Sequence, residues 1–492
     1  MAKKQKIERR AFSQLRVAEY LRFETLQKMT GRSFRDFPRV VVKELLDNAL
    51  DAVETAGSAP QIEVVIDQDA RARCFRLRVV DNGDGLSPDM VARTLDFETL
   101  TSDKALYRTP SRGQQGNALK SIIAMPYALG NKNPLVTITA RGLQHQIRLR
   151  LGAGDEIIPG HKTESVENAE GTDITVWLPK VRVASSKESA FTGFGIHRDV
   201  GRLLRGYHLF NPHAKVSFST SGLVPNMVNP TSPSLPKSQK LTFRPTRATR
   251  SSCRVTRPSS TGSTALPSLG SFATTSLTAM TCTWASSSLS SGASPRSQGE
   301  RRAGAGAQCA QTLRPLRRGH QQLSGLSDED ISSLFDEMCS LVKKPSHNVL
   351  GSPIGEEHLV GSLRRLCGNG GRSWYKLIKT QLNGAPAVVE AAIVETEAVG
   401  GAFIGLNHSP TYADPLSDSY LSHYSGNDDV SGFGVRGFLQ DARALGPDHY
   451  EGGYGTAVAV HITAAAPTTT DRGKTQLSVE GDEFEEDLAK AL

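Results

Sequence analysis

The segment VVKELLDNALDA, which begins at Val41, carries acidic and amide side chains at helical spacing. Glu44, Asn48 and Asp51 are four and then three residues apart, so on a helix they line one face while the aliphatic residues between them face a core. A carboxylate and an amide then project together, as groups suited to binding or activating a polar ligand. A solvated polar stripe has the same spacing, and this segment alone does not exclude it.

A second candidate is the turn DNGDGL at residues 81–86, which directly follows the strand-like run FRLRVV. Its two glycines, Gly83 and Gly85, allow a tight backbone turn that other residues resist. Asp81 is then expected at the end of the strand. An ordinary hairpin turn of the Asn-Gly type is the alternative interpretation.

A third candidate is the glycine-rich run TPSRGQQGNALKSIIAMPYAL. Gly113 and Gly116 lie just before a helix expected to begin near Asn117, and free backbone N–H groups at a helix N-terminus bind phosphates well. Ordinary helix capping gives a similar pattern. Further along, Gly171-Thr172 opens the strand-like run TDITVWLP, which is a weak signal by itself.

The elements that must position these residues follow an α+β pattern. We expect an arm over residues 1–35 and a first domain over 36–222, with a helix at 38–54 and alternating strands such as IEVVID, LVTITA and HQIRLRL. A second α+β domain is expected over 327–492. Its predicted elements are a helix at 328–343, a helix at 355–366, the strands APAVVEAAIVE and TAVAVHITA, and an acidic helix at 482–492.

The segment between these domains, residues 223–326, differs in composition from the rest of the chain. From 225 to 326, 32 of 102 residues are Ser or Thr, and 13 lysines and arginines face a single acid, Glu300. Such a segment buries too little apolar surface to offset chain entropy, which predicts a low-complexity linker. A frameshifted stretch of coding sequence is an equal alternative, because ordinary sequence returns abruptly at LSDEDISSLFDEM.

The net charge of +8 comes from this segment. The other residues comprise 45 bases and 49 acids, so the overall charge does not by itself indicate a nucleic-acid partner. No run of about 18 apolar residues is available to cross a bilayer, and the N-terminus lacks the apolar segment of a secretory signal. We therefore expect a cytoplasmic protein without a membrane partner.

Taken in order, the four motifs resemble the nucleotide site of the GHKL ATPase superfamily, with a Bergerat-type α+β sandwich. This resemblance implies ATP and Mg²⁺ as cofactors. It implies that Glu44 orients and deprotonates the attacking water, that Asn48 holds the metal ion, and that Asp81, supported by Thr172, accepts from the adenine amino group. The implied nucleotide-binding residues are Asn48, Asp51, Asp81, Gly83, Gly85, Arg112, Gly113, Gln114, Gln115, Gly116, Asn117, Lys120 and Thr172.

Within the superfamily, the lid SRGQQG at 111–116 resembles that of the B subunit of topoisomerase VI. The segments GSPIGEEHL, FIGLNHSPTYADPL and DRGKTQL resemble its transducer, a domain of the ribosomal S5-like type. The resemblance implies that Lys474 in DRGKTQL is a catalytic lysine that contacts the γ-phosphate. Asn117-Ala118-Leu119-Lys120 departs from the family's usual lid, and the helix-two-turns-helix module is not recognisable in residues 223–326.

The function implied by this resemblance is that of an ATP-operated B subunit of a type IIB DNA topoisomerase. The chain would form an ATP-dependent homodimer that acts on DNA with a cleaving A-like subunit. Two alternatives stay open. One is a stand-alone GHKL ATPase switch in repair, defence or chaperoning, and the other is a disrupted homologue without activity. Only a short stretch follows DRGKTQL, so little of the family's long terminal helix is expected.

Overall fold

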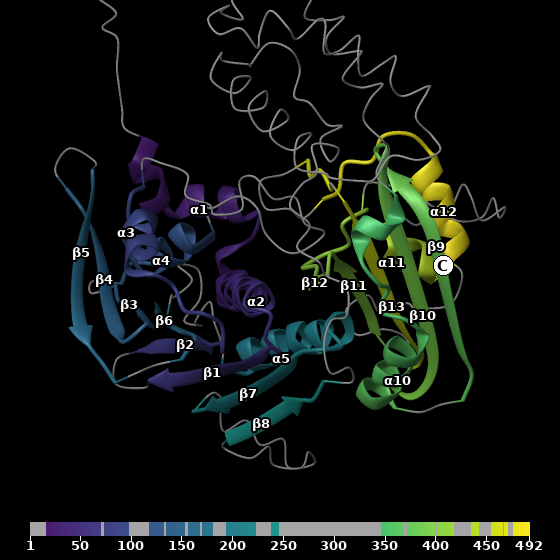
Figure 1. Cartoon of the computed structure of the whole chain (residues 1–492), viewed down its shortest axis with the longest axis horizontal. Coiled ribbons are helices and arrows are strands. Elements are labelled where there is room, and N and C mark those ends of the chain that lie inside the picture. Colours follow the sequence, from purple (N-terminus) through teal and green to yellow (C-terminus); the bar gives the residue numbers. More distant parts are fainter. Residues whose placement is uncertain are drawn as a thin grey trace, which may run out of the picture. The chain divides into compact units, whose positions relative to one another are not determined.

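A computed structural model describes most of the chain outside the central segment. The described residues are 16–69, 73–97, 118–131, 134–152, 156–167, 170–180, 193–222, 238–245, 346–368, 371–399, 401–417, 434–441, 454–465, 467–470 and 476–492. The chain divides into two compact units, residues 1–255 with 350–492 and residues 256–349. Nearly all the described residues, which Figure 1 shows in colour, belong to the first unit.

The first sheet has eight strands in the order β5-β4-β3-β6-β2-β1-β7-β8. All its neighbouring strands pair antiparallel except β1 and β7, which are parallel with Ile62 opposite Val216. Burial alternates along β3 and β7, as it must when one face of a sheet is covered. The strands are β1 (Gln61–Asp69), β2 (Cys74–Val80), β3 (Val136–Ala140), β4 (Leu143–Leu151), β5 (Ile157–Ser165), β6 (Thr172–Pro179), β7 (Lys215–Ser221) and β8 (Ser238–Phe243).

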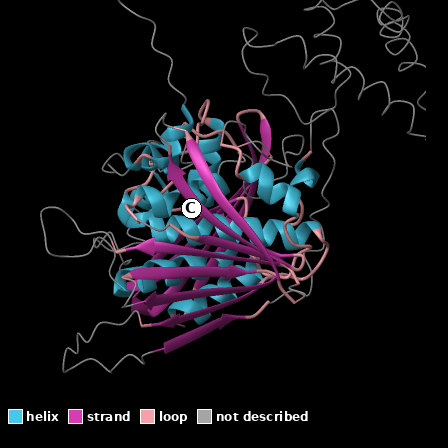
Figure 2. Ribbon diagram, turned by 90° about the vertical axis from the view of Figure 1, so that its left-hand side faces the viewer, coloured by secondary structure: helices cyan, strands magenta, loops and turns pink. Residues whose placement is uncertain are grey.

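Helices α2 (Phe37–Thr55), α4 (Ala118–Ala128) and α5 (Gly193–Phe210) contact this sheet on its covered face. Figures 1 and 2 show them against the strands. Pro38 suits the start of α2, because proline costs little in the first turn of a helix, where its missing N–H has no intrahelical partner. A short helix, α3 (Pro88–Thr94), is capped by Ser87, whose hydroxyl accepts from the Met90 amide at 3.2 Å.

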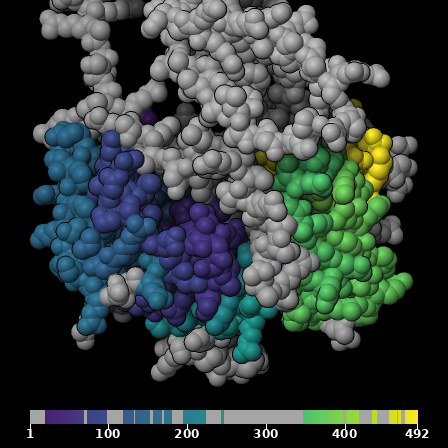
Figure 3. All heavy atoms as spheres, viewed as in Figure 1, coloured from purple at the N-terminus to yellow at the C-terminus, as the bar shows by residue number. Residues whose placement is uncertain are grey.

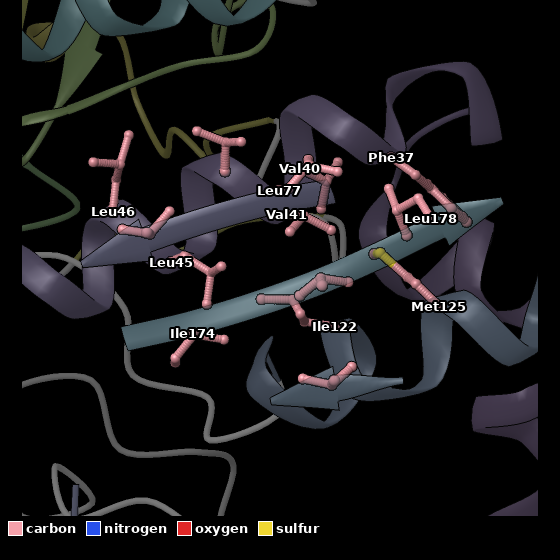
Figure 4. Packing of buried hydrophobic residues seen from close by; sticks show 14 of the residues in the cluster. Phe37, Val40, Val41, Leu45, Leu46, Leu77, Ile122, Met125, Ile174 and Leu178 are labelled. Atoms are coloured by element: carbon pink, nitrogen blue, oxygen red, sulfur yellow. The ribbon is translucent and has the colours of Figure 1, made fainter. Parts of the chain in front are cut away.

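The core between these helices and the sheet is built from aliphatic and aromatic side chains (Figure 4). Residues of α2 such as Val41 and Leu45 meet Leu77 of β2, Ile122 of α4 and Ile174 of β6, and all of them are buried. The side of α2 next to its polar stripe is therefore fixed against two strands and a second helix. In Figure 3 the purple, blue and teal residues of this half adjoin one another on the surface.

The segment before α2 is part of the same core. It forms the 3-10 helix η1 (Arg16–Leu21), α1 (Phe23–Thr30) and the short 3-10 helix η2 (Phe34–Asp36). Leu21 and Leu26 are buried, and the rings of Phe23 and Phe34 pack together with centroids 5.2 Å apart and planes inclined by 50°. Most of the described part of the expected arm thus packs on helices α4 and α2, with a smaller contact between η1 and β5.

The second sheet has five strands in the order β12-β11-β13-β10-β9. β11 runs parallel to β13, whereas the other neighbouring strands run antiparallel. The described elements from residue 346 onward are η5 (His347–Leu350), α10 (Glu356–Cys367), β9 (Ser373–Leu382), β10 (Ala385–Val399), β11 (Gly401–Leu406), β12 (Ser409–Pro410), α11 (Gly434–Asp441), β13 (Tyr454–Ala464) and α12 (Glu483–Ala491).

Helix α5 packs against both sheets. Its last residues, Leu209 and Phe210, share a buried cluster with α10, β10 and β13. Two glycines permit this close packing: a Cβ on Gly206 would press on Pro410, and one on Gly405 would overlap the Phe210 ring. We refer to the contacts of α5 and α2 with α10, β11 and β12 as the joint.

Most of the expected elements are confirmed, with α2, β10, β13 and α12 within a few residues of their predicted bounds. One boundary differs. β8 pairs with β7 and so extends the first sheet beyond residue 222, into the range assigned to the low-complexity segment. The helix expected at 328–343 lies outside the described residues. Among the helices that the structure describes, none is both long and apolar enough to cross a membrane.

Candidate nucleotide-binding site

The polar stripe of α2 is formed as its spacing predicts, although its three members differ in burial. Glu44 is half-buried, Asn48 is exposed and Asp51 is only 6% exposed. Lys43 and Asp47 occupy the next row around the helix, one residue earlier in each turn. The helix thus offers one carboxylate and one amide at an accessible surface, while Asp51 is fixed inside.

The turn after β2 is organised by the carboxylate of Asp81. Its Oδ1 accepts from the Gly83 amide at 2.8 Å and from the Thr172 amide at 3.2 Å. The Asp81 amide in turn donates to the Thr172 carbonyl at 3.0 Å. The structure therefore brings Asp81, Gly83 and Thr172 together, across 91 residues of sequence.

Three glycines make this close packing possible. Gly171 has φ 74°, and a Cβ at this position would overlap the carbonyl oxygen of Asp81. Gly85 has φ 77°, and its Cβ would come within 2.9 Å of the Gly171 carbonyl. A Cβ on Gly83 would lie 3.3 Å from Ala52, so the turn rests directly on α2, next to Asp51.

Burial raises the pKa of the Asp81 carboxyl, while the Gly83 and Thr172 amides oppose that rise. A carboxylate offers about four lone-pair sites. After the two amides on Oδ1 and the Thr172 hydroxyl, acceptor capacity is left for one further donor. An exocyclic amino group is a donor of this kind, and a water-poor site makes the bond selective.

Lys120 lies on α4 and is fully buried. Its ammonium donates to the carbonyl of Asp96, and burial lowers the pKa of Lys120. A nucleotide contact by Lys120 stays a prediction. The predicted lid residues and the predicted catalytic lysine lie outside the described residues: Arg112, Gly113, Gln114, Gln115, Gly116, Asn117 and Lys474.

Sequence reasoning missed a second group of polar residues on α2. Asp47 is 6% exposed, forms an ion pair with Lys43 at 2.7 Å, and accepts from Ser409 of β12 at 2.9 Å. The pair Lys43/Asp47 was visible as an i,i+4 spacing, but its partner lies 362 positions away. No metal-binding group of three or more His, Cys, Asp or Glu side chains is found in the described part of the chain.

Comparison with known proteins finds similarity over the residues that form this arrangement. Residues 35–182 match the family of histidine kinase-, DNA gyrase B- and HSP90-like ATPases. The DNA mismatch repair protein MutL of Bacillus mycoides is 30% identical over 142 residues, which are 28% of this chain and 19% of that protein. MutL of Bacillus anthracis is 30% identical over 142 residues, 28% of this chain and 20% of that protein. The matched part thus spans about a fifth of the length of these relatives.

Solved structures that align with this chain are more distant in sequence. The Aquifex aeolicus MutL ATPase domain complexed with ADP is 12% identical, with a TM-score of 0.31, over 86% of this chain and 89% of that one. The ATPase region of Saccharomyces cerevisiae topoisomerase II bound to ICRF-187 is 9% identical, with a TM-score of 0.34, over 90% of this chain and 78% of that one.

The family match covers α2, the Asp81 turn and Thr172, which are the elements that the hydrogen bonds and glycine contacts bring together. The expected α+β fold is confirmed, including a large sheet with helices on one face. The chain carries a GHKL ATPase domain, matched over residues 35–182.

Proposed function

We propose that the chain binds and hydrolyses ATP at the site formed by α2 and the Asp81 turn. The observation that carries this proposal is the buried carboxylate of Asp81, which is held by Gly83 and Thr172 and retains acceptor capacity for an adenine amino group. Glu44, half-buried on the adjacent face of α2, has the chemistry to orient and deprotonate the attacking water. Lid amides at 113–117 would stabilise the phosphate charge.

A divalent cation fits this site. Mg²⁺ is usually held by one or two protein oxygens, with phosphates and water completing its six ligands. Asn48 presents an exposed amide oxygen one helical turn from Glu44, so it can be such a ligand without a cluster of carboxylates. When bound, the ion would neutralise phosphate charge. The residues of α2 would position the water and the base.

We further propose that ATP binding operates the second sheet, as in a topoisomerase VI-like B subunit. Two of the three segments that support this proposal contact the C-terminal end of α5. His358 of GSPIGEEHL lies 2.9 Å from the His208 carbonyl, and His408 of FIGLNHSPTYADPL lies 3.0 Å from the Phe210 carbonyl. Such carbonyls have no partner within a helix, so these imidazoles cap α5. The partners would be DNA, a second copy of this chain and an A-like cleaving subunit.

A second candidate is a repair-type ATPase switch that works without a cleaving subunit. The sequence match to MutL proteins over 142 residues favours it. The two candidates share the ATP site and differ in their partners. Purified chain mixed with a separately expressed topoisomerase VI A-type subunit distinguishes them: ATP-dependent relaxation of supercoiled DNA supports the first, and failure of the subunits to associate supports the second.

The ATPase proposal is tested by steady-state hydrolysis with the full chain. We expect Glu44→Ala to lower kcat by about 100-fold or more, within the range for loss of a general base, while ATP binding is retained. Glu24→Ala, which removes an exposed glutamate of α1, is the matched control and should turn over ATP like the wild type. Equal kcat in the Glu44→Ala variant and the wild type would refute the assignment.

A further inference from the structure

Four polar side chains from three elements meet in one buried cluster at the joint. Asp47 of α2 accepts from Lys43 at 2.7 Å, from the Tyr207 hydroxyl of α5 at 2.6 Å and from the Ser409 hydroxyl of β12 at 2.9 Å. The Lys43 ammonium also donates to the Ser409 oxygen at 2.6 Å. We call Lys43, Asp47, Tyr207 and Ser409 the Asp47 cluster.

The members of the cluster are hydrogen-bonded to one another, and the Tyr207 hydroxyl also donates to the Lys43 backbone carbonyl at 3.1 Å. Lys43 and Asp47 have side chains only 12% and 9% exposed, and Tyr207 is fully buried. A buried charge needs close partners because water cannot replace them. Ser409 serves both ions at once, since its oxygen accepts from Lys43 while its hydrogen points to Asp47. Loss of this one hydroxyl leaves a cation and an anion each short of a partner.

The Asp47 cluster lies directly beside the proposed reacting groups. Lys43 and Asp47 each precede a member of the polar stripe, Glu44 and Asn48, by one residue on α2. Neighbouring residues on a helix are about 100° apart, so the two stripes run side by side. Because Lys43 and Asp47 are held to Ser409 of the second sheet, the rotation of α2 about its axis is fixed, and with it the direction in which Glu44 and Asn48 point.

Ser409 is itself held at a defined position. It follows Asn407 and His408, which have φ 49° and 65°, in the turn between β11 and β12. Asn211, just after α5, donates to the His408 carbonyl at 2.8 Å, and the His408 amide donates to the ring of His461 on β13 at 3.0 Å. A shift of this turn relative to α5 would be transmitted to Asp47.

We propose that Ser409 and Asp47 are positioning residues, which couple the β11–β12 turn of the second sheet to the orientation of Glu44 on α2. The inference rests on the proposed ATPase function and adds a regulation to it. The conformation of the second sheet controls the alignment of the base, so hydrolysis is fastest while Ser409 bridges Lys43 and Asp47. Nucleotide recognition at Asp81 does not depend on this bridge.

The test is a kcat and ATP-affinity comparison of full-length variants, with ATP affinity measured by equilibrium titration of a fluorescent ATP analogue. We expect Ser409→Ala to lower kcat by about tenfold and to leave the affinity within about twofold of wild type. Ser409→Thr retains the hydroxyl and should recover most of the rate. Ser417→Ala is the control, because its hydroxyl bonds to Gln476, 2.8 Å away, and not to α2.

Tyr207→Phe removes a different donor to Asp47 and leaves the residues of the second sheet unchanged. This variant tests the proposal if Ser409→Ala does not fold. It too should reduce kcat more than affinity. Unchanged kcat in both variants would overturn the inference while leaving the ATPase assignment intact. Equal losses of kcat and affinity would overturn it as well, as would a Ser409→Thr variant no faster than Ser409→Ala. A wild-type chain that binds no ATP would refute the proposed function itself.

Discussion

The Asp81 turn and the joint are held together in different ways. The turn is held by backbone amides and by glycines that leave no room for a side chain, so its shape is set within short stretches of sequence. The joint is held by side chains, including the buried ion pair of Lys43 and Asp47. A backbone-built site is rigid, whereas a side-chain network can rearrange. This contrast fits a rigid nucleotide-binding turn beside a joint whose side-chain contacts can change.

The strongest way to break the turn is Gly171→Ala. A methyl group there would collide with the Asp81 carbonyl, and the left-handed φ of 74° disfavours any residue except glycine. We expect the free energy of unfolding to fall by about 4 kcal/mol, from backbone strain and overpacking together. Chemical denaturation followed by circular dichroism measures this change.

Gly201→Ala is the matched control, because Gly201 lies within α5 and its Cβ would meet no atom within 4 Å. It should raise the free energy of unfolding by up to about 1 kcal/mol, since alanine favours a helix over glycine. Similar effects of the two substitutions would contradict the close contact at Gly171.

The corresponding way to break the joint is Asp47→Ala. It leaves the Lys43 ammonium buried without its anion and removes the acceptor for Tyr207 and Ser409. The free energy of unfolding should fall by about 3 kcal/mol, as when one partner of a buried ion pair is deleted. Asp67→Ala, at a more exposed ion pair with Arg76 on β2, should cost about 1 kcal/mol or less and is the comparison in the same denaturation assay. An Asp47→Ala variant as stable as Asp67→Ala would mean that the cluster does not hold the joint.

Acid should loosen the joint before it affects the turn. Burial, with smaller effects of His358 and Arg365, lowers the pKa of His208 to about 4. The unfolded chain therefore takes up a proton on this residue as pH falls below about 6.5, while the folded chain does not. Stability from His208 is complete above about pH 6.5 and is lost as the pH falls towards 4.

We expect this loss to be about 2 kcal/mol between pH 6.5 and pH 4.5. His208→Phe, which keeps a ring stacked on Phe243, should flatten that part of the pH profile of unfolding. An unchanged slope in the variant would assign the pH dependence to another group.

The parts of the fold that could be read from sequence are those with local periodicity. Helix α2 and strand β10 have clear apolar patterns, whereas β5, with Pro159 and Gly160 and mostly exposed side chains, has none. Strand β8 lies within residues 223–326, which were predicted to be a low-complexity segment. Composition alone does not reveal that β8 pairs with β7.

The site divides in the same way. Asp81 and its glycines form a motif within a few residues, so they were found. Ser409 and Tyr207 were not found, because nothing near either of them in sequence indicates that α2 lies opposite. Side-chain contacts between elements hundreds of residues apart depend on the packing of α5 between the sheets, and only the structure shows that packing.

ATP binding by Asp81→Asn tests the central claim most directly. Asparagine keeps the oxygen that accepts from Gly83 and Thr172, so the turn should fold and the free energy of unfolding should change by less than about 1 kcal/mol. The added amide is a donor and would oppose the adenine amino group. We predict at least about 100-fold weaker ATP binding in the variant by isothermal titration. Wild-type affinity in the folded variant would contradict the placement of the nucleotide at this turn.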